Sequence, residues 1–199
     1  DTDKVVFEIN GCCPIPLKDG RISYIVNESI IKISKINEVG EEDEIPIKRA
    51  EINPDEDKSE LNLIKDGIQL KNGNLLLISW DKTITEYDLK KKQCIQVIET
   101  SIDFMDTCYE LKDGRIGITA TDNGNIYLIN TLRQRNDNVT TLSGHSNTVI
   151  KILQLANEQI ISSSYDGKVK IWYKLLDGNF NCAMTLYLFE DYILCWIFL

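Results

Sequence analysis

The chain has 199 residues, a formal net charge of −9 and a sequence pI near 4.7, and 43% of its residues are apolar. With 27% charged residues it has the composition of an ordinary globular protein, and its length fits one domain. The negative charge repels phosphate backbones and anionic membrane surfaces, so the composition argues against nucleic acid and membranes as partners.

The beginning of the chain and its cysteines indicate a cytoplasmic protein. The first residues, DTDKVVFEIN, contain no apolar stretch after a basic start, so we expect no secretory signal. The cysteines stand at positions 12, 13, 94, 108, 182 and 195, without a C-x-x-C pair, and His145 is the only histidine. A zinc site would need a different spacing of ligands. We therefore expect reduced thiols, no metal and no cofactor.

A short hairpin motif starts at Leu17 and recurs along the chain. Its copies read LKDGRIS, LKNGNLL, LKDGRIG and LANEQII, and they begin at Leu17, Leu70, Leu111 and Leu155, with steps of 53, 41 and 44 residues. Each copy has a Leu, then a polar turn and then an apolar strand. Self-similarity of this kind indicates a repeat architecture.

A second turn follows in each copy of the motif. Its turn position holds Asn27, Asp81, Asn123 and Asp166, and the position six residues later holds Ile33, Tyr87, Ile129 and Trp172. In the last copy Asp166 and Gly167 predict a two-residue turn, because Gly accepts a positive φ. Two further strands are expected in 93–111 and again in 138–155, so that each unit has four strands.

Four short antiparallel strands at a period of about 40 to 45 residues predict an all-β chain, a β-propeller of four-stranded blades. We assign the blades to these ranges: blade 1 about 5–37, blade 2 about 61–92, blade 3 about 93–134, blade 4 about 138–175, and the start of blade 5 about 179–199. Such a propeller is incomplete or part of a larger ring. Either the chain is a piece of a longer propeller, or a partner chain completes the ring, or the tail folds back to cap it.

Two segments break the repeat. The acidic insertion 38–60 is expected to be a solvated loop with an edge strand near Ile45 to Ile47, and the alternative is a docking site for a basic partner. The very apolar end, 186–199, is short for a bilayer span and carries Glu190 and Asp191. We expect a buried strand there.

The fourth copy resembles the WD-repeat β-propeller family, because Gly144-His145 precedes it and Trp172 ends its third strand. In that family a His, an Asp in the tight turn, a Ser or Thr and the Trp form a buried hydrogen-bonded set. The resemblance assigns these places to His145, Asp166, Trp172 and either Ser162 or Ser164, with Asp81 and Tyr87 as counterparts in the second copy. Ser146 beside His145 also suggests a nucleophile and its base, but the register of the repeat favours the structural role.

The resemblance implies a non-enzymatic scaffold for protein–protein interaction, as a subunit or fragment of a larger assembly. Its partners would be other proteins, among them a chain that completes the propeller. Arginine and aromatic residues dominate interface hot spots, so the candidate contacts are Phe104, Tyr109, Arg133 and Arg135.

Two other functions remain open from the sequence. The first is a hydrolase with a carboxylate pair in the propeller channel, formed by Asp103 and Asp106 or by Glu190 and Asp191. The second is a purely structural subunit that lends blades to an assembly and binds nothing transient.

Overall fold

The computed structural model describes residues 11–27, 29–35, 43–47, 63–131 and 139–187. Within these ranges every regular element is a β-strand, and the strands form four sheets of four antiparallel strands each. These residues include no helix that is long and apolar enough to cross a membrane. The predicted all-β class and its four-stranded antiparallel units are confirmed.

Each sheet consists of strands that follow one another in the chain. The first sheet contains β1 (Cys12–Pro16), β2 (Arg21–Val26), β3 (Ile30–Lys35) and β4 (Asp43–Pro46). The second contains β5 (Ile64–Gln69), β6 (Leu75–Ser79), β7 (Thr83–Asp88) and β8 (Gln93–Glu99). The third contains β9 (Met105–Glu110), β10 (Ile116–Ala120), β11 (Ile126–Ile129) and β12 (Val139–Leu142). The fourth contains β13 (Val149–Gln154), β14 (Ile160–Ser164), β15 (Lys168–Lys174) and β16 (Phe180–Tyr187).

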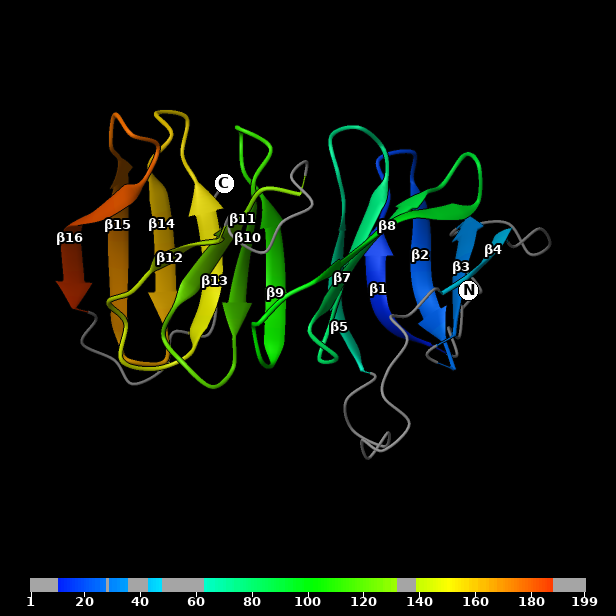
Figure 1. Ribbon diagram of the computed structural model, residues 1–199, viewed down its shortest axis with the longest axis horizontal. Helices are drawn as coiled ribbons and strands as arrows, with labels where there is room; N and C mark the ends of the chain where they lie inside the picture. Colours follow the sequence, from blue (N-terminus) through cyan, green and yellow to red (C-terminus); the bar gives the residue numbers. More distant parts are fainter. Residues whose placement is uncertain (1–10, 28, 36–42, 48–62, 132–138, 188–199) are drawn as a thin grey trace, which may run out of the picture.

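The first strands of successive sheets stand side by side, as Figure 1 shows. Strand β1 lies next to β5, β5 next to β9, and β9 next to β13. This is a propeller-like arrangement, in which each sheet is a blade. Strands β5 and β9 stand between β1 and β13, so the described residues form an open row of blades and no closed ring.

Three apolar cores fill the spaces between successive sheets. The core between the second and third sheets includes Leu76 and Ile84 on one side and Ile116 and Ile118 on the other. Because the second and third sheets have a neighbour at each face, all residues of β6 (LLLIS) and β10 (IGITA) are buried. The outer strand β8 instead alternates exposed and partly buried residues, of which Cys94 packs against the first core and Ile98 against the second.

A common turn joins the first two strands of every sheet. In each turn the Leu carbonyl accepts the N–H three residues later, and the Leu N–H donates to the residue four positions later. The Leu N–H bonds run from Leu17 to Arg21, Leu70 to Asn74, Leu111 to Arg115 and Leu155 to Gln159, all at 2.8 Å. The hairpin copies found in the sequence are therefore the same local structure four times over.

In the first three sheets the residue after the Leu joins its sheet to the next one, and we call these bonds the turn connectors. The backbone N–H of Lys18 donates to Gln69 Oε1 (2.7 Å), that of Lys71 to Glu110 Oε2 (2.7 Å) and that of Lys112 to Gln154 Oε1 (2.6 Å). Two of the ammonium groups also reach the next sheet: Lys18 Nζ donates to the Leu70 carbonyl (2.9 Å) and Lys71 Nζ to the Leu111 carbonyl (2.7 Å).

The sheets divide the chain differently from the ranges assigned to the blades. Strand β8 opens the range given to blade 3 but pairs with β7, and β12 lies in the range given to blade 4 but pairs with β11. Strand β16, expected to start blade 5, is the outer strand of the fourth sheet. The reason is that a strand close behind its predecessor pairs with it at little loop-closure cost. Strand β4 is the edge strand expected near Ile45 to Ile47, and it places 43–46 of the acidic insertion in the first sheet.

The register of the first sheet also differs from the expected one. Trp172 pairs with Ile160, and the residue in the corresponding place of the first sheet is Ser34, which pairs with Ile22. Ile33, expected there, pairs with Ser23 and packs in the core between the first two sheets. The β2–β3 turn is centred one residue after Asn27, so counting from Asn27 was wrong by one position.

Candidate functional site

The fourth sheet brings His145, Ser162, Asp166 and Trp172 into one hydrogen-bonded chain. Trp172 Nε1 donates to Ser162 Oγ at 2.8 Å, and His145 Nε2 lies 2.8 Å from the same Oγ. His145 Nδ1 lies 3.0 and 3.1 Å from the two carboxylate oxygens of Asp166. The Asp166 carboxylate can only accept, so His145 donates from Nδ1, and the Nε2 of the neutral ring accepts a hydrogen bond from the Ser162 hydroxyl.

The protonation states of His145 and Asp166 in this hydrogen-bonded set follow from burial and from their hydrogen bonds. Burial lowers the pKa of His145 below its ordinary value of 6.5, against the opposing effect of Asp166, so the imidazole is neutral at pH 7. Burial acts to raise the pKa of Asp166, but the backbone N–H of Ser146 and the His145 ring outweigh it, and the pKa is lowered. Asp166 also accepts the backbone N–H of Lys168 at 3.0 Å, which closes the β14–β15 turn around the carboxylate.

Three residues separate β14 from β15, one more than the two-residue turn expected from Asp166 and Gly167. The Gly167 N–H donates to the Ser164 carbonyl at 3.2 Å, and Gly167 has a φ of 74°. Ser164 Oγ donates to the Asn147 carbonyl at 2.8 Å and accepts the Asp166 N–H at 3.1 Å. Ser162 therefore takes the fourth place beside the Trp, and Ser164 supports the turn.

The order Ser162, His145, Asp166 has the hydrogen-bond pattern of a serine-hydrolase triad, but the site cannot do that chemistry as it stands. Ser162 is 0% exposed, and the His145 and Asp166 side chains are 0% and 2% exposed. The lone pair of Ser162 Oγ that faces Trp172 already accepts its N–H. A nucleophile without access to a substrate is a structural group, and Ser146 contributes only its backbone N–H, to Asp166.

The second sheet keeps part of this set. Asp81 accepts the Thr83 N–H at 3.0 Å, as Asp166 accepts that of Lys168. Tyr87 is 0% exposed and packs in the core between the first two sheets, with Leu75 and Leu77 beside it. Leu77 stands where the fourth sheet has Ser162, so this position is filled by apolar packing.

A partly exposed aromatic cluster lies where β6 ends, and we call Leu63, Lys65, Trp80 and Phe104 the Trp80 cluster. The Trp80 and Phe104 rings meet edge to face with centroids 5.6 Å apart, and Lys65 Nζ lies 4.6 Å from the centroid of the Trp80 ring. Phe104 and Leu63 are 43% and 38% exposed. The backbone N–H of Trp80 donates to the Leu63 carbonyl at 3.0 Å, which joins the end of β6 to the residue before β5.

Of the four candidate contacts, Phe104 lies in this cluster. Tyr109 is partly buried against the core between the third and fourth sheets, and Arg133 and Arg135 lie outside the described residues. Trp80 was missed, although an aromatic residue directly before the turn Asp occurs twice, in SWD and in SYD. Its counterpart Tyr165 is 66% exposed.

Of the carboxylates named for a hydrolase, Asp103 and Asp106 lie within the described residues. Asp103 lies 2.7 Å from Lys82 Nζ in an exposed ion pair, and Glu190 and Asp191 lie outside the described residues. Asp66 on β5 is the carboxylate that the sequence did not single out. Burial raises its pKa and the charge of Asp106 adds to this, although the Cys108 N–H donates to it at 2.9 Å and opposes the rise.

The cysteines are free thiols at all five described positions. Burial raises the pKa of Cys13 to about 12, and the neighbouring Cys12 adds to the rise, so Cys13 is not a thiolate at neutral pH. Cys108 is buried and its pKa is also raised by burial. The described residues contain no group of three His, Cys, Asp or Glu side chains that could hold a metal ion.

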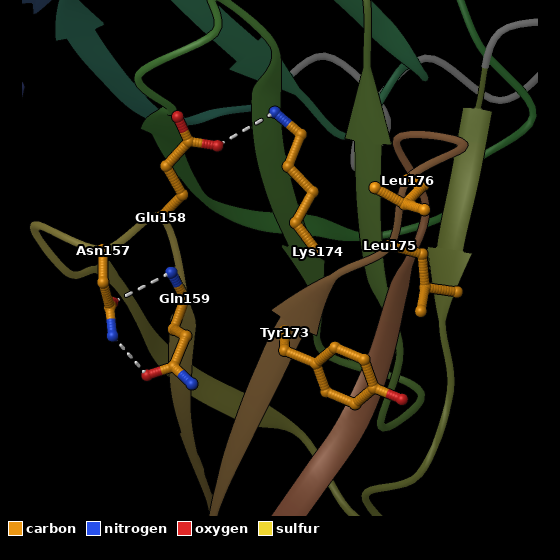
Figure 2. A pocket seen from close by; sticks show the side chains of 7 residues that line it. All are labelled: Asn157, Glu158, Gln159, Tyr173, Lys174, Leu175 and Leu176. Atoms are coloured by element: carbon orange, nitrogen blue, oxygen red, sulfur yellow. Dashed lines mark hydrogen bonds and ion pairs between the residues drawn. The ribbon is translucent and has the colours of Figure 1, made fainter.

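A shallow depression of about 520 Å³ lies at the end of the fourth sheet that carries the β13–β14 turn, away from Asp166 (Figure 2). It is lined by Asn157, Glu158, Gln159, Tyr173, Lys174, Leu175 and Leu176. Lys174 bridges Glu158 (3.2 Å) and Asp113 of the third sheet (3.1 Å). Burial opposes ionisation of Asp113, but its hydrogen bonds from Arg115 and Lys174 lower its pKa to about 2. The charged side chains of the depression, Lys174 and Glu158, thus already form structural ion pairs.

Comparison with known proteins shows the fold alone. The chain is similar to a protein of unknown function from Bacteroides caccae, with a TM-score of 0.62 and 13% identity. The similar region covers 88% of this chain and 60% of that one, so the chain spans about three fifths of the length of that protein. Similarity extends to 854 chains of solved structures, and so widespread a fold does not specify a function. No family model and no curated protein matches the chain.

Proposed function

We propose that the protein is a non-enzymatic scaffold of the WD-repeat type, which binds other proteins in the cytoplasm as a subunit or part of a larger assembly. The observation that carries the proposal is the Trp80 cluster. It combines two aromatic rings, a Leu and a Lys on an exposed edge, and interface hot spots are enriched in aromatic residues surrounded by such contacts.

The geometry of the Trp80 cluster favours a protein partner over a small ligand. Its exposed side chains, Leu63 and Phe104, are large apolar groups of the kind found at protein interfaces, whereas small-molecule sites are concave. Trp80 Nε1 is buried and has no hydrogen-bond partner among the described residues. An unpaired buried donor is costly, so the cluster holds a polar group that the described residues leave unsatisfied.

Two further features support the proposed WD-repeat type of the scaffold and its proposed location in the cytoplasm. The hydrogen-bonded set of His145, Ser162, Asp166 and Trp172 has the members that the WD-repeat resemblance assigns. The free thiols at the described cysteine positions fit the reducing compartment that we propose.

The proposal is tested by removing the exposed part of the Trp80 cluster. Phe104→Ala and Leu63→Ser change side chains that are 43% and 38% exposed, so the fold should tolerate them. We expect proteins that co-purify stoichiometrically with the native chain to be lost from both variants, measured by quantitative mass spectrometry. The matched control is Ile95→Ala, at a 46% exposed position on β8. Equal recovery of the same proteins by all three variants would contradict the proposal.

The hydrolase remains a second candidate because of Asp66. A carboxyl group whose pKa is raised by burial, beside a second carboxylate, is the usual form of a general acid. Purified protein is assayed against generic glycoside and ester substrates. Turnover by the native chain that is lost in Asp66→Asn would establish hydrolysis and would overturn the scaffold as the sole function.

A further inference from the structure

The fourth sheet has a face that repeats the pattern of an inter-blade interface. We call the face of each sheet that looks toward the next sheet in the chain its forward face, and the opposite one its rear face. In three interfaces a forward face packs on the next rear face. The forward side supplies Ile31 and Ile33, then Leu76 and Ile84, then Ile126 and Leu128.

The forward face of the fourth sheet carries apolar side chains at the same places. Cross-strand partners point to the same side of a sheet, and Leu153, Ile161, Ile171 and Met184 are successive partners across its four strands. Val169 and Leu186 form a second pair on this side. None of these six belongs to the three apolar cores between the described sheets, and Val169 is 9% exposed. Met184 and Leu186 are 52% and 43% exposed.

The depression of Figure 2 extends this face toward the Leu turn of the fourth sheet. Tyr173 follows Ile171 by two residues, so its side chain lies on the forward side, and it is 37% exposed. Leu175 and Leu176, 37% and 111% exposed, stand beside it. The apolar surface thus runs from the outer strand to the turn where the other sheets hold their connectors.

The first sheet does not complement this face. Its rear side carries the ion pair of Lys32 and Glu44 (3.2 Å) and the hydrogen bond between Tyr24 and Ser34 (3.2 Å). Pro16 stands directly before Leu17, where the other sheets have Gln69, Glu110 and Gln154 to accept a turn connector. The first sheet of the same chain, or of a second copy, would bury charges against Ile171 and Met184 at high cost.

We propose that the forward face of the fourth sheet binds a four-stranded β-sheet of a partner chain. The partner's rear face is apolar, and its first strand ends on Gln or Glu directly before a Leu turn. That side chain accepts the backbone N–H of Ala156, which stands directly after Leu155, as Lys18, Lys71 and Lys112 stand after their Leu. This surface is separate from the Trp80 cluster, so either can fail without the other.

Photo-crosslinking of the full-length protein in the cells that make it tests the proposal. The photoreactive residue benzoylphenylalanine replaces Met184 on the forward face and, in a matched control, Ile95 on the outer strand of the second sheet, 46% exposed. We expect a light-dependent adduct with a different chain from the Met184 position only. Mass spectrometry of the adduct should place the crosslink in a strand of a β-sheet that has Gln or Glu before Leu.

The other outcomes overturn the proposal. An adduct with a second copy of this chain would make the face a self-association surface, and an adduct within the same chain would show that the chain covers the face itself. Absence of an adduct, or equal adducts from both positions, would show that no specific sheet docks there. The native protein bound to its partner should elute from size exclusion as a larger particle than the isolated chain. A second variant, Met184→Lys, should abolish this difference in size while the melting temperature of the isolated chain stays unchanged. Ile95→Lys should leave both the size and the melting temperature unchanged.

Discussion

His145 is held at both ring nitrogens, by Ser162 on one side and Asp166 on the other. This fixes the tautomer and the ring plane, and through Ser162 it also fixes the indole of Trp172 in the core between the third and fourth sheets. A loop residue before β13, a turn residue and two strand residues are thereby joined. The set holds the fourth sheet together, so removing one of its members should lower the free energy of unfolding.

The first prediction concerns Asp166→Ala. The substitution leaves the backbone N–H groups of Ser146 and Lys168 and the His145 ring without their acceptor. We expect a loss of about 1–3 kcal/mol in the free energy of unfolding, the cost of buried groups left unpaired. His145→Ala should cost a similar amount. Urea unfolding followed by tryptophan fluorescence measures both.

The control for this prediction is Asp177→Ala, in the exposed β15–β16 turn, where Asp177 accepts the Asn179 N–H at 2.9 Å. Both aspartates support a turn, but the groups around Asp177 can bond to water instead, so the cost should be well below 1 kcal/mol, roughly that of a surface change. Equal losses in the free energy of unfolding for Asp166→Ala and Asp177→Ala would contradict a stabilising role of the hydrogen-bonded set.

The second prediction concerns pH. The pKa of His145 lies below its ordinary value of 6.5 because of burial, so between these two values the unfolded chain binds a proton that the folded chain does not. Stability should therefore fall as the pH falls below about 6.5, by no more than about 1.4 kcal/mol per pH unit. Asp66, whose pKa is raised by burial, acts with the opposite sign.

Urea unfolding at pH 7.5, 6.5 and 5.5, done on the native chain and on His145→Asn, separates the two groups. Asp66 contributes to both proteins, so the difference in slope belongs to His145, the only histidine of the chain. Parallel slopes for the two proteins would contradict the neutral, buried imidazole.

At the scale of the element, the Leu turns both close their hairpins and tie one sheet to the next. Lys71 does this most completely, because its backbone N–H reaches Glu110 and its ammonium group reaches the Leu111 carbonyl, each at 2.7 Å. The second of these bonds depends on the side chain and can be removed without touching the backbone.

The third prediction is that Lys71→Met lowers the free energy of unfolding by about 1 kcal/mol, since methionine keeps much of the aliphatic stem and loses one partly buried charged hydrogen bond. Lys90→Met, at an exposed position of the β7–β8 turn, is the matched control and should change stability by less than about 0.5 kcal/mol. Thermal melts of both variants decide this, and a silent Lys71→Met would mean that the ammonium bond contributes nothing.

The repeated hairpins were predictable from the sequence, because a Leu, a polar turn and an apolar strand recur with little change. The grouping of strands into sheets was not. The run that became β8 could pair backward with β7 or begin the next unit, and the pattern of Gln93–Glu99 fits either choice. Only the shorter connection, read from the structure, decides it. The register of the first sheet failed for a related reason, since one residue of offset at Asn27 moves every side chain to the other face.

The hydrogen-bonded set was predictable because its members stand at fixed places in the repeat. The Trp80 cluster was not, because Lys65 and Phe104 are far from Trp80 in the sequence and meet only through the packing of β5 and β9. Asp66 was missed for the same reason, since its raised pKa comes from burial by strands that no local pattern identifies.

At the scale of the whole molecule, the described sheets form an open row with two inner and two end sheets. The inner sheets pack at both faces, and every residue of β6 and β10 is buried. The corresponding strands of the end sheets, β2 and β14, each contain at least one partly buried residue. Stability should therefore vary along the row, because protection follows the number of packed neighbours.

The fourth prediction is that amide hydrogens of β6 and β10 exchange with solvent more slowly than those of β2 and β14, the corresponding strands of the end sheets. Hydrogen exchange followed by mass spectrometry on the isolated chain measures this. Equal protection in all four strands would show that the row unfolds as one unit, or that both end faces are covered.

Each turn connector has a direction. A sheet donates from the residue after its Leu to the sheet that follows, and accepts, at the residue before its Leu, from the sheet that precedes. The second and third repeats carry both halves, so an extra copy inserted between them would find a matching neighbour on either side. Tandem duplication or deletion of a repeat thus preserves the turn connectors, and the number of blades can change during evolution while the same hydrogen bond joins each pair of neighbours.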